Sequence, residues 1–302
     1  MRVIFIVNNQ AGNYKGRKVW HKVRSELTIT YELYETIHSR YVIDLVKELA
    51  LCQDQQLIIV IGGDGTIHEA VNGAAGCRHI TLAYMKAGSG NDFARAFMYF
   101  ESARDIERYL QQPIKRYVDC GEIYYNGNET KKFINNFGIG FDAYVSKLTN
   151  ESKMKKVLNK VGLGKLSYAY FVVQALIQFR PFKLTLELNG QLQTFQNVWF
   201  VTVSNQPYFG GGMNLSPTSV VDDAQLEVTV VNQLPRLKFL ALFLTVFKAA
   251  HTKFKAVTQL QGTDIHFTTD AMLPMHTDGE TEMLKQHEVR CVVLENVVTI
   301  AK

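Results

Sequence analysis

The first third of the chain alternates short apolar runs with stretches of helical periodicity. Arg2–Val7 has the length and composition of a strand, and Leu57–Ile61 is continuously apolar, as in strands that are buried on both faces. The apolar residues between and after these runs recur at helical spacing. They predict helices over Val19–Leu27, Tyr41–Leu51 and Ile67–Ala74, and a further strand over His79–Tyr84. Strands and helices in alternation predict a parallel sheet with crossover helices, a βαβαβ region.

From about residue 121 the pattern changes to alternating strands joined by turns. Asn126-Gly127 and Asn189-Gly190 are dipeptides that favour tight hairpins. Strands are predicted over Phe182–Leu188, Val198–Ser204, Leu226–Val231, Asp264–Thr268 and Val289–Leu294, and helices over Ser167–Phe179 and Leu237–Ala250. We therefore predict an α/β domain over residues 1–121, which residues 291–302 could complete, and a β-rich domain over residues 122–290.

The composition fits a folded enzyme and excludes several other classes of protein. The chain has 302 residues, of which 47% are apolar and 20% charged, and a formal net charge of +5. Its cysteines, Cys52, Cys77, Cys120 and Cys291, form no C-x-x-C pair, so reduced thiols are expected rather than a zinc knuckle or a disulfide framework. The apolar N-terminal run is too short for a signal peptide, and no stretch reaches the ~20 apolar residues of a spanning helix. These features predict a cytoplasmic protein.

The sequence Gly62-Gly63-Asp64-Gly65-Thr66 lies directly after the buried strand and directly before a predicted helix. A glycine-rich turn at a helix N-terminus lets backbone N–H groups approach a phosphate closely. Asp64 would repel a bare phosphate, so its presence suggests that Mg²⁺ lies between the carboxylate and the anion. Thr66 and Glu69 have the spacing of a capping box, and the alternative is that Asp64 merely caps the helix.

A second turn of this kind, Gly88-Ser89-Gly90-Asn91-Asp92, follows the next predicted strand and opens a predicted helix near Phe93. Ser89 and Asp92 again have capping-box spacing. Two such turns at the carboxyl ends of strands converge on the crevice where α/β sheets bind ligands, which indicates a nucleotide. The chain has no P-loop, H-E-x-x-H or G-x-S-x-G motif. Gly138–Ala143 matches the dinucleotide pattern but lacks a βαβ context, and we interpret it as a chance match.

These motifs, together with His68-Glu69-Ala70-Val71-Asn72-Gly73, resemble the catalytic domain of the diacylglycerol kinase and sphingosine kinase superfamily. The similarity is greatest to the bacterial soluble diacylglycerol kinase type and extends over nearly the whole chain. The further segments that match in order and spacing are Asn8–Gly12, Tyr34–Thr36 with His38, Gly138–Ala143, Gly210–Met213 with Pro217, Asp222-Asp223 and Asp278–Glu280.

The resemblance implies a fold and a nucleotide site. The fold would be a Rossmann-like α/β nucleotide domain related to those of NAD kinases and phosphofructokinases, followed by a β-sandwich-like domain, with the active site between them. ATP would contact four segments of the first domain. Its expected contacts are Asn8, Asn9, Gln10, Ala11, Gly12, Thr36, Gly62, Gly63, Asp64, Gly65, Thr66, Ile67, His68, Ser89 and Asn91. Asn9, Ala11 and Ser89 depart from the usual Pro, Ser and Thr of the family, and Ala11 loses one potential phosphate contact.

The acceptor side of the reaction would depend on Asp278-Gly279-Glu280. A lipid hydroxyl has a pKa far above neutrality, so a carboxylate that takes its proton during phosphoryl transfer would assist the reaction. The resemblance implies that Glu280 is this proton acceptor, with Asp278 beside it and Asp64 at the nucleotide. The alternatives are that Asp278 is the base and Glu280 orients it, or that Asp-Gly is only a hairpin turn.

A second Mg²⁺ site, away from the chemistry, is also implied by the resemblance. Its ligands would be the Asp223 side chain and the backbone carbonyls of Val220 and Gln225. The family usually has glycine where this chain has Ala224. If that position requires a positive φ, alanine there costs energy and the loop could differ.

Two segments could meet a membrane surface. Lys147–Lys165 is rich in lysine, and the apolar helix predicted over Leu237–Ala250 is flanked by basic residues, although a solvated charged face and a core helix are the alternatives. Nucleic acid is a poorer explanation of the positive charge, because no binding module accompanies it. A homodimer is one option for the oligomeric state.

The leading hypothesis is an ATP- and Mg²⁺-dependent lipid kinase that phosphorylates the primary hydroxyl of diacylglycerol or a similar lipid. One alternative is an NAD kinase-like phosphotransferase. The other is a non-catalytic nucleotide or lipid sensor on the same scaffold.

Overall fold

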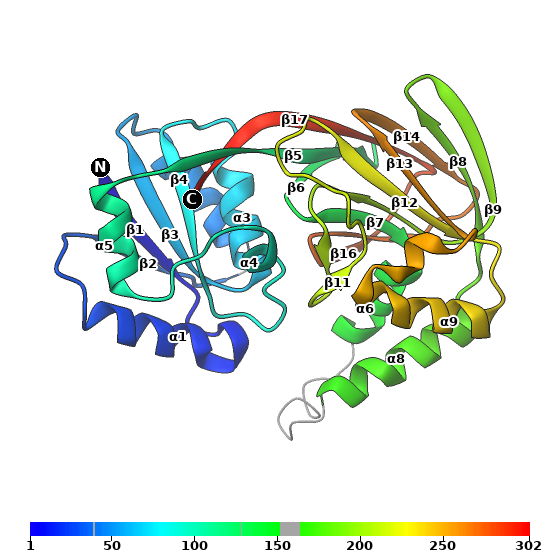
Figure 1. Cartoon of the computed structure of the whole chain (residues 1–302), viewed down its shortest axis with the longest axis horizontal. Coiled ribbons are helices and arrows are strands. Elements are labelled where there is room, and N and C mark those ends of the chain that lie inside the picture. The colour runs from blue at the N-terminus through cyan, green and yellow to red at the C-terminus, as the bar shows by residue number, and fades with distance from the viewer. Residues whose placement is uncertain (39, 128, 152–163) are drawn as a thin grey trace.

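The computed structural model describes residues 1–38, 40–127, 129–151 and 164–302 (Figure 1). Its first domain has a parallel sheet in the order β4-β3-β1-β2. The strands are β1 (Arg2–Val7), β2 (Glu32–Glu35), β3 (Gln56–Gly62) and β4 (Ile80–Lys86). The helices are α1 (Ala11–Arg24), α2 (Tyr41–Leu49), α3 (Asp64–Ala74), α4 (Phe93–Ala96) and α5 (Ala103–Gln111). The predicted α/β nucleotide-domain fold is confirmed.

Helices cover both faces of this parallel sheet. Ile58 and Val60 of β3 pack in one buried cluster with residues of α2 and α3. Leu57 and Ile59 of the same strand pack in another cluster with residues of α1 and α5. Every residue of β3 is therefore buried, which explains its continuously apolar sequence.

The second domain is largely antiparallel and carries helices at one end (Figure 1). Its strands are β5 (Lys115–Tyr125), β6 (Glu129–Phe133), β7 (Asn136–Gly140), β8 (Phe182–Leu188), β9 (Gln191–Ser204), β10 (Tyr208–Phe209), β11 (Met213–Asn214), β12 (Leu226–Asn232), β13 (Val257–Gly262), β14 (Asp264–Thr269), β15 (Pro274–Thr277), β16 (Glu280–Met283) and β17 (Glu288–Ala301). Its helices are α6 (Phe141–Glu151), α8 (Gly164–Gln178), α9 (Arg236–Thr245), η1 (Val246–Lys248) and η2 (Ala250–Lys253).

Two long strands, β5 and β17, connect the domains. They pair with each other in antiparallel direction from Lys115↔Ala301 to Tyr124↔Arg290, with a register shift between Leu294 and Val298. β17 also pairs with β14 of the second domain and, at Ile300, with Leu82 of β4. The C-terminal end of the chain thus lies in the sheet of the first domain (Figure 1). The backbone pairing on both sides of this register shift fixes the relative position of the two domains.

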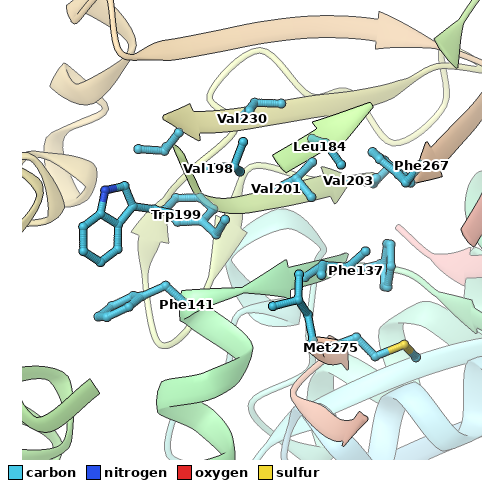
Figure 2. Close-up of a cluster of buried hydrophobic side chains, with 14 of the residues drawn as sticks. Phe137, Phe141, Leu184, Val198, Trp199, Val201, Val203, Val230, Phe267 and Met275 are labelled. Atoms are coloured by element: carbon cyan, nitrogen blue, oxygen red, sulfur yellow. The ribbon is translucent and has the colours of Figure 1, made fainter. Parts of the chain in front are cut away.

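An aromatic cluster anchors helices to the second domain's sheet. The Trp199 ring of β9 stacks on Phe239 of α9, with ring centroids 4.3 Å apart, and meets Phe141 of α6 edge-on. In Figure 2 the side chains of Trp199 and Phe141 extend to the same side, and their rings are neighbours. The Trp199 Nε1–H donates to the carbonyl of Leu234, so its polar atom is paired. The inner face of α9 is therefore held by packing against the sheet.

Most predicted elements are present, but local details differ. Both Asn-Gly hairpins form, with φ of 48° and 90° at Asn126-Gly127 and 52° and 75° at Asn189-Gly190. The predicted helix near Phe93 is only the short α4, while β2 and α5 were not predicted.

The capping boxes predicted at the two glycine-rich turns are wrong. The N-cap of α3 is Gly63 and that of α4 is Asp92, and neither helix start has a side-chain capping hydrogen bond. The Glu69 carboxylate instead accepts the N–H groups of Arg40 and Val42 at the start of α2. The spacing predicted that Glu69 caps its own helix, α3, but in the structure it caps the start of α2.

None of the helices in the described residues is long and apolar enough to cross a bilayer. Of the lysine-rich segment Lys147–Lys165, residues 152–163 lie outside the described residues.

Candidate active site

The two glycine-rich turns meet at the carboxyl edge of the parallel sheet. Gly63, at the start of α3, and Gly88, after β4, approach so closely that a Cβ atom added to Gly88 would lie 2.5 Å from the Gly63 Cα. Gly12 has a φ of 56°, and a Cβ atom there would lie 2.1 Å from the Ala87 carbonyl oxygen. Only glycine allows these backbones to pack in contact. The predicted convergence of the turns is present in the structure.

Asn8 organises the loop between β1 and α1. Its Oδ1 accepts the N–H groups of Gln10 and Ala11, both at 3.1 Å. Its Nδ2 donates to the Thr66 Oγ1 at 3.0 Å. The first loop is thereby tied to the N-terminal turn of α3, and both segments face the same cavity.

A cavity of about 510 Å³ opens at this edge of the sheet. The residues that line it are Asn8, Gln10, Ala11, Gly12, Thr36, Ile37, His38, Val42, Gly63, Gly65, Thr66, Glu69, Gly88, Ser89 and Glu280. The cavity therefore brings together four predicted nucleotide segments from the first domain and the predicted proton acceptor from the second. Ile37, His38 and Val42 extend the predicted set on the side of Thr36.

Not all of the expected nucleotide contacts line the cavity. Asn9, Gly62, Asp64, Ile67, His68 and Asn91 do not line it. Ile67 is fully buried in the first domain's core. Asn91 has a φ of 55°, and its Oδ1 accepts the Gly88 N–H at 3.1 Å and the Tyr84 hydroxyl at 3.2 Å. Asn91 thus shapes the second turn from within.

Beside Gly90 lie two carboxylates, the buried Asp92 and the half-buried Asp64. A Cβ atom added to Gly90 would lie 2.8 Å from Oδ2 of Asp64 and 3.7 Å from Oδ2 of Asp92. Asp64 accepts the Phe93 N–H, whereas Asp92 accepts the Gly211 N–H at 2.8 Å and pairs with Arg95 at 3.4 Å. Burial raises the pKa of both carboxyls. The charge of Asp278 raises the pKa of Asp64 further, and the charge of Asp64 does the same for Asp92.

This pair is suited to a divalent cation, because hard cations prefer carboxylate oxygens and offset the charge that burial disfavours. Asp92 was not among the predicted site residues. The capping-box spacing drew attention to its local role, whereas its partner Gly211 lies 119 residues further along the chain.

The Asp278 carboxylate is fully occupied by hydrogen bonds. It accepts the N–H groups of Ile134, Asn135 and Asn136 at 2.8–3.0 Å. His68 Nδ1 lies 2.7 Å from Asp278 Oδ2, and both side chains are almost completely buried. A carboxylate with four donors has no lone pair directed at a substrate. This geometry favours a positioning role for Asp278 over the alternative that it is the base.

His68 and Asp278 form a buried contact between the domains, which is an ion pair when His68 is protonated. Burial lowers the pKa of His68, but the Asp278 charge and hydrogen bond outweigh that effect, so the pKa is raised overall. His68 was expected to contact the nucleotide; it lies instead beneath the cavity, where it links α3 to the β15–β16 hairpin.

Glu280 begins β16 and faces the cavity from the second domain. The turn before it places Asp278 at a φ of 47° and Gly279 at 91°, as in a tight hairpin. Its Oε2 lies 3.7 Å from the Lys131 Nζ, which also pairs with Glu282. Glu280 therefore remains accessible while the anchored Asp278 fixes the turn that carries it. Lys131, which no sequence motif indicated, lies on β6.

In the loop over residues 220–225, Ala224 adopts the positive φ that glycine would favour at this position. Ala224 adopts a φ of 57°, and its N–H donates to the Asp119 Oδ2 at 2.8 Å. Asp119 also accepts the Asn296 N–H, so it is fully buried and paired, while Asp223 Oδ1 accepts the Gln225 N–H. Asp223 keeps a second carboxylate oxygen, which suits a hard cation that retains several waters. No cluster of three metal-ligating His, Cys, Asp or Glu side chains occurs among the described residues.

Comparisons with known proteins agree with this geometry. Residues 2–123 match the family model of the diacylglycerol kinase catalytic domain, and residues 135–300 match that of the YegS C-terminal NAD kinase beta sandwich-like domain. The chain is 33% identical to "Putative lipid kinase YtlR" of Bacillus subtilis, over 91% of this chain and 92% of that protein. It is 29% identical to a diacylglycerol kinase of Bacillus subtilis, over 78% of this chain and 74% of that one.

A solved structure with the same fold is described as "a putative diacylglycerol kinase from Bacillus anthracis str. Sterne". It has a TM-score of 0.76 and 24% identity, and the match covers 99% of this chain and 96% of that one. At this identity the likeness shows the fold alone.

Proposed function

The chain belongs to the diacylglycerol kinase catalytic-domain family of lipid kinases, and we propose that it transfers the γ-phosphoryl group of ATP to the primary hydroxyl of diacylglycerol or a related lipid. With diacylglycerol the product would be phosphatidic acid. The observation that carries the proposal is that Glu280, from the second domain, lines the same cavity as the glycine-rich turns of the first.

The nucleotide would occupy the part of the cavity that the first domain provides. Backbone N–H groups of the Gly12, Gly63 and Gly88 turns would bind phosphate oxygens, aided by the partial positive charge at the start of α3. The adenine would lie toward Thr36 and Val42, the less polar side of the cavity. This leaves the γ-phosphate directed at Glu280.

Glu280 would take the proton of the acceptor hydroxyl as the new phosphorus–oxygen bond forms. The group needs access to substrate and a fixed position. Its side chain retains 36% of its exposure, and the hairpin that carries it is held through Asp278. Asp278 orients the hairpin but cannot itself accept the proton, because its oxygens are occupied.

Mg²⁺ would bind at two places. Asp64 and Asp92 would hold the ion that accompanies the ATP phosphates, where it neutralises charge that builds up during transfer. Asp223, with the carbonyls of Val220 and Gln225, would hold a second ion away from the chemistry. The two carboxylates beside Gly90, both with a pKa raised by desolvation, support the first of these sites.

A direct assay tests the proposed activity. Purified protein is incubated with γ-labelled ATP and Mg²⁺ in detergent micelles that contain diacylglycerol, and a parallel reaction contains NAD. Label in phosphatidic acid supports the proposal. Label in NADP would instead indicate the NAD kinase-like alternative, and ATP binding without transfer to either acceptor would contradict diacylglycerol as the substrate.

A further inference from the structure

The outward face of α8 is apolar where solvent contact would favour polar residues. Tyr170, Val173 and Ile177 are 55%, 48% and 68% exposed. They recur at i, i+3 and i+7 and therefore lie along one side of the helix. The opposite side carries Phe171 and Ala175, which are buried against the domain.

Helix α9 repeats this arrangement. Leu237, Ala241 and Leu244 are exposed at i, i+4 and i+7, with Leu237 at 80% and Leu244 at 67%. Phe239 and Leu242 on the other side are buried. A helix that is hydrophobic all round is normally enclosed by protein or in contact with lipid, and this one has protein on one side only.

The two helices form one surface, which we call the α8–α9 face. They pack against each other, and Arg236 at the start of α9 donates to the carbonyls of Leu176 and Phe179 at the end of α8. Phe247 and Phe254, at 53% and 47% exposure, extend the apolar surface beyond α9. Figure 1 shows both helices along the lower edge of the second domain, on the same side of the molecule as α1.

The two segments that form the α8–α9 face carry charge of a single sign. Lys238, Lys248, Lys253 and Lys255 are all exposed beside the apolar residues. The segments 164–180 and 236–263 contain neither aspartate nor glutamate. An apolar face whose own segments contain basic and no acidic residues is complementary to the anionic surface of a lipid bilayer.

We propose that the α8–α9 face docks on an anionic bilayer, with its exposed leucine and phenylalanine side chains inserted at the level of the headgroups. The inference rests on the proposed function in one respect: a kinase whose acceptor is a bilayer lipid must approach that surface. A second copy of the chain is a poorer occupant. A symmetric contact would bring the lysines of both copies together, with no carboxylate in these segments to pair with them.

Vesicle flotation without nucleotide tests the docking directly. The full chain is mixed with vesicles of phosphatidylcholine alone or of equal parts phosphatidylcholine and phosphatidylglycerol. We expect binding to the anionic vesicles, weakening as salt rises. The double variant Leu237→Glu/Leu244→Glu should bind at least about tenfold more weakly, since it replaces inserted apolar groups with charges repelled by the surface. Lys248→Gln/Lys253→Gln should lower the affinity with little effect on folding.

Leu192→Glu is the matched control. Leu192 is 69% exposed, like Leu244, but it lies on the β8–β9 hairpin. The affinity of the Leu192→Glu variant for vesicles should stay within about twofold of that of the original chain. All variants should keep the thermal unfolding midpoint of the original chain.

Three results would overturn the proposal. The first is that the original chain does not bind anionic vesicles. The second is that Leu192→Glu loses as much vesicle affinity as the Leu237→Glu/Leu244→Glu variant. The third is that the original chain is a dimer in solution and the Leu237→Glu/Leu244→Glu variant is a monomer. Phosphoryl transfer in detergent micelles is measured separately on each variant. If the variants bind vesicles as expected but no chain transfers phosphate, the proposed function fails while the docking surface stands. If transfer occurs but vesicle binding does not behave as expected, only the docking surface is removed.

Discussion

His68 Nδ1 lies 2.7 Å from Asp278 Oδ2, and this buried pair connects the nucleotide-binding domain to the hairpin that carries Glu280. One helical turn along α3, the Asn72 side chain makes a second connection: it donates to the Lys132 carbonyl of β6 and accepts the Lys132 N–H. The helix whose N-terminus would bind ATP therefore also positions the second domain's catalytic edge. Changes at this pair should affect turnover without direct contact with either substrate.

Replacing His68 with Gln should destabilise the protein, because it leaves the buried Asp278 carboxylate without its cationic partner. Removal of one member of a buried pair typically costs roughly 3–5 kcal/mol. The pKa of His68 is raised, so its ion pair contributes fully below the ordinary histidine pKa of about 6.5 and is lost as pH rises through the raised value.

Denaturant unfolding of both proteins from pH 6 to pH 9 checks this expectation. The difference in unfolding free energy should be largest at pH 6 and shrink as the pH rises. His21→Gln, at an exposed position, is the control and should change little at any pH. A pH-independent difference would show that the pair is not ionic. Turnover should fall more than the KM for ATP rises, since His68 does not line the cavity.

Replacing Glu280 with Gln should lower kcat by roughly 10²–10⁴-fold, the usual contribution of a general base. ATP affinity and the thermal midpoint should stay unchanged, because the side chain is partly exposed and lies on the acceptor side. Glu282→Gln is a close control: it also pairs with Lys131 but does not line the cavity. Equal activity losses in the two variants would instead indicate that the Lys131 pairing, not a base, supports turnover.

Replacing Asp64 or Asp92 with Asn should abolish Mg²⁺-dependent transfer. Each variant keeps an oxygen that accepts the same backbone N–H group, so the turns should remain folded. In EDTA both variants should unfold at a higher temperature than the original chain, because they remove a charge that burial disfavours. Titration of activity against Mg²⁺, together with thermal unfolding in EDTA, checks both effects. Unchanged Mg²⁺ dependence in the Asp92 variant would remove it from the proposed ion site.

The sequence predicted the parts of the site that depend on local order. Glycines directly between a buried strand and a helix indicate a tight turn, so the turns at Gly63 and Gly88 were predictable. The roles of Glu69, His68 and Asp92 were not, because each is set by a partner distant in sequence: Val42, Asp278 and Gly211. The spacing within each segment favoured capping boxes, but the carboxylates of Glu69 and Asp92 accept hydrogen bonds from other parts of the chain instead.

Asp119 was missed for the same reason. It stands in the middle of β5 with no motif around it, yet its two oxygens hold the backbone at Ala224 and Asn296. The Asn-Gly hairpins, by contrast, depend only on their own two residues, and both were predicted correctly.

Replacing Ala224 with Gly should stabilise the protein, because Ala224 is held at a φ of 57° by the hydrogen bond from its N–H to Asp119. A non-glycine residue in this region costs on the order of 1–2 kcal/mol, which glycine avoids, although the greater freedom of glycine in the unfolded chain offsets part of the gain. A net gain of roughly 1 kcal/mol is expected in denaturant unfolding. Ala256→Gly, at a position without positive φ, should instead be neutral or destabilising. If both variants lose stability equally, the strain at Ala224 is relieved by its surroundings and the loop accommodates alanine without cost.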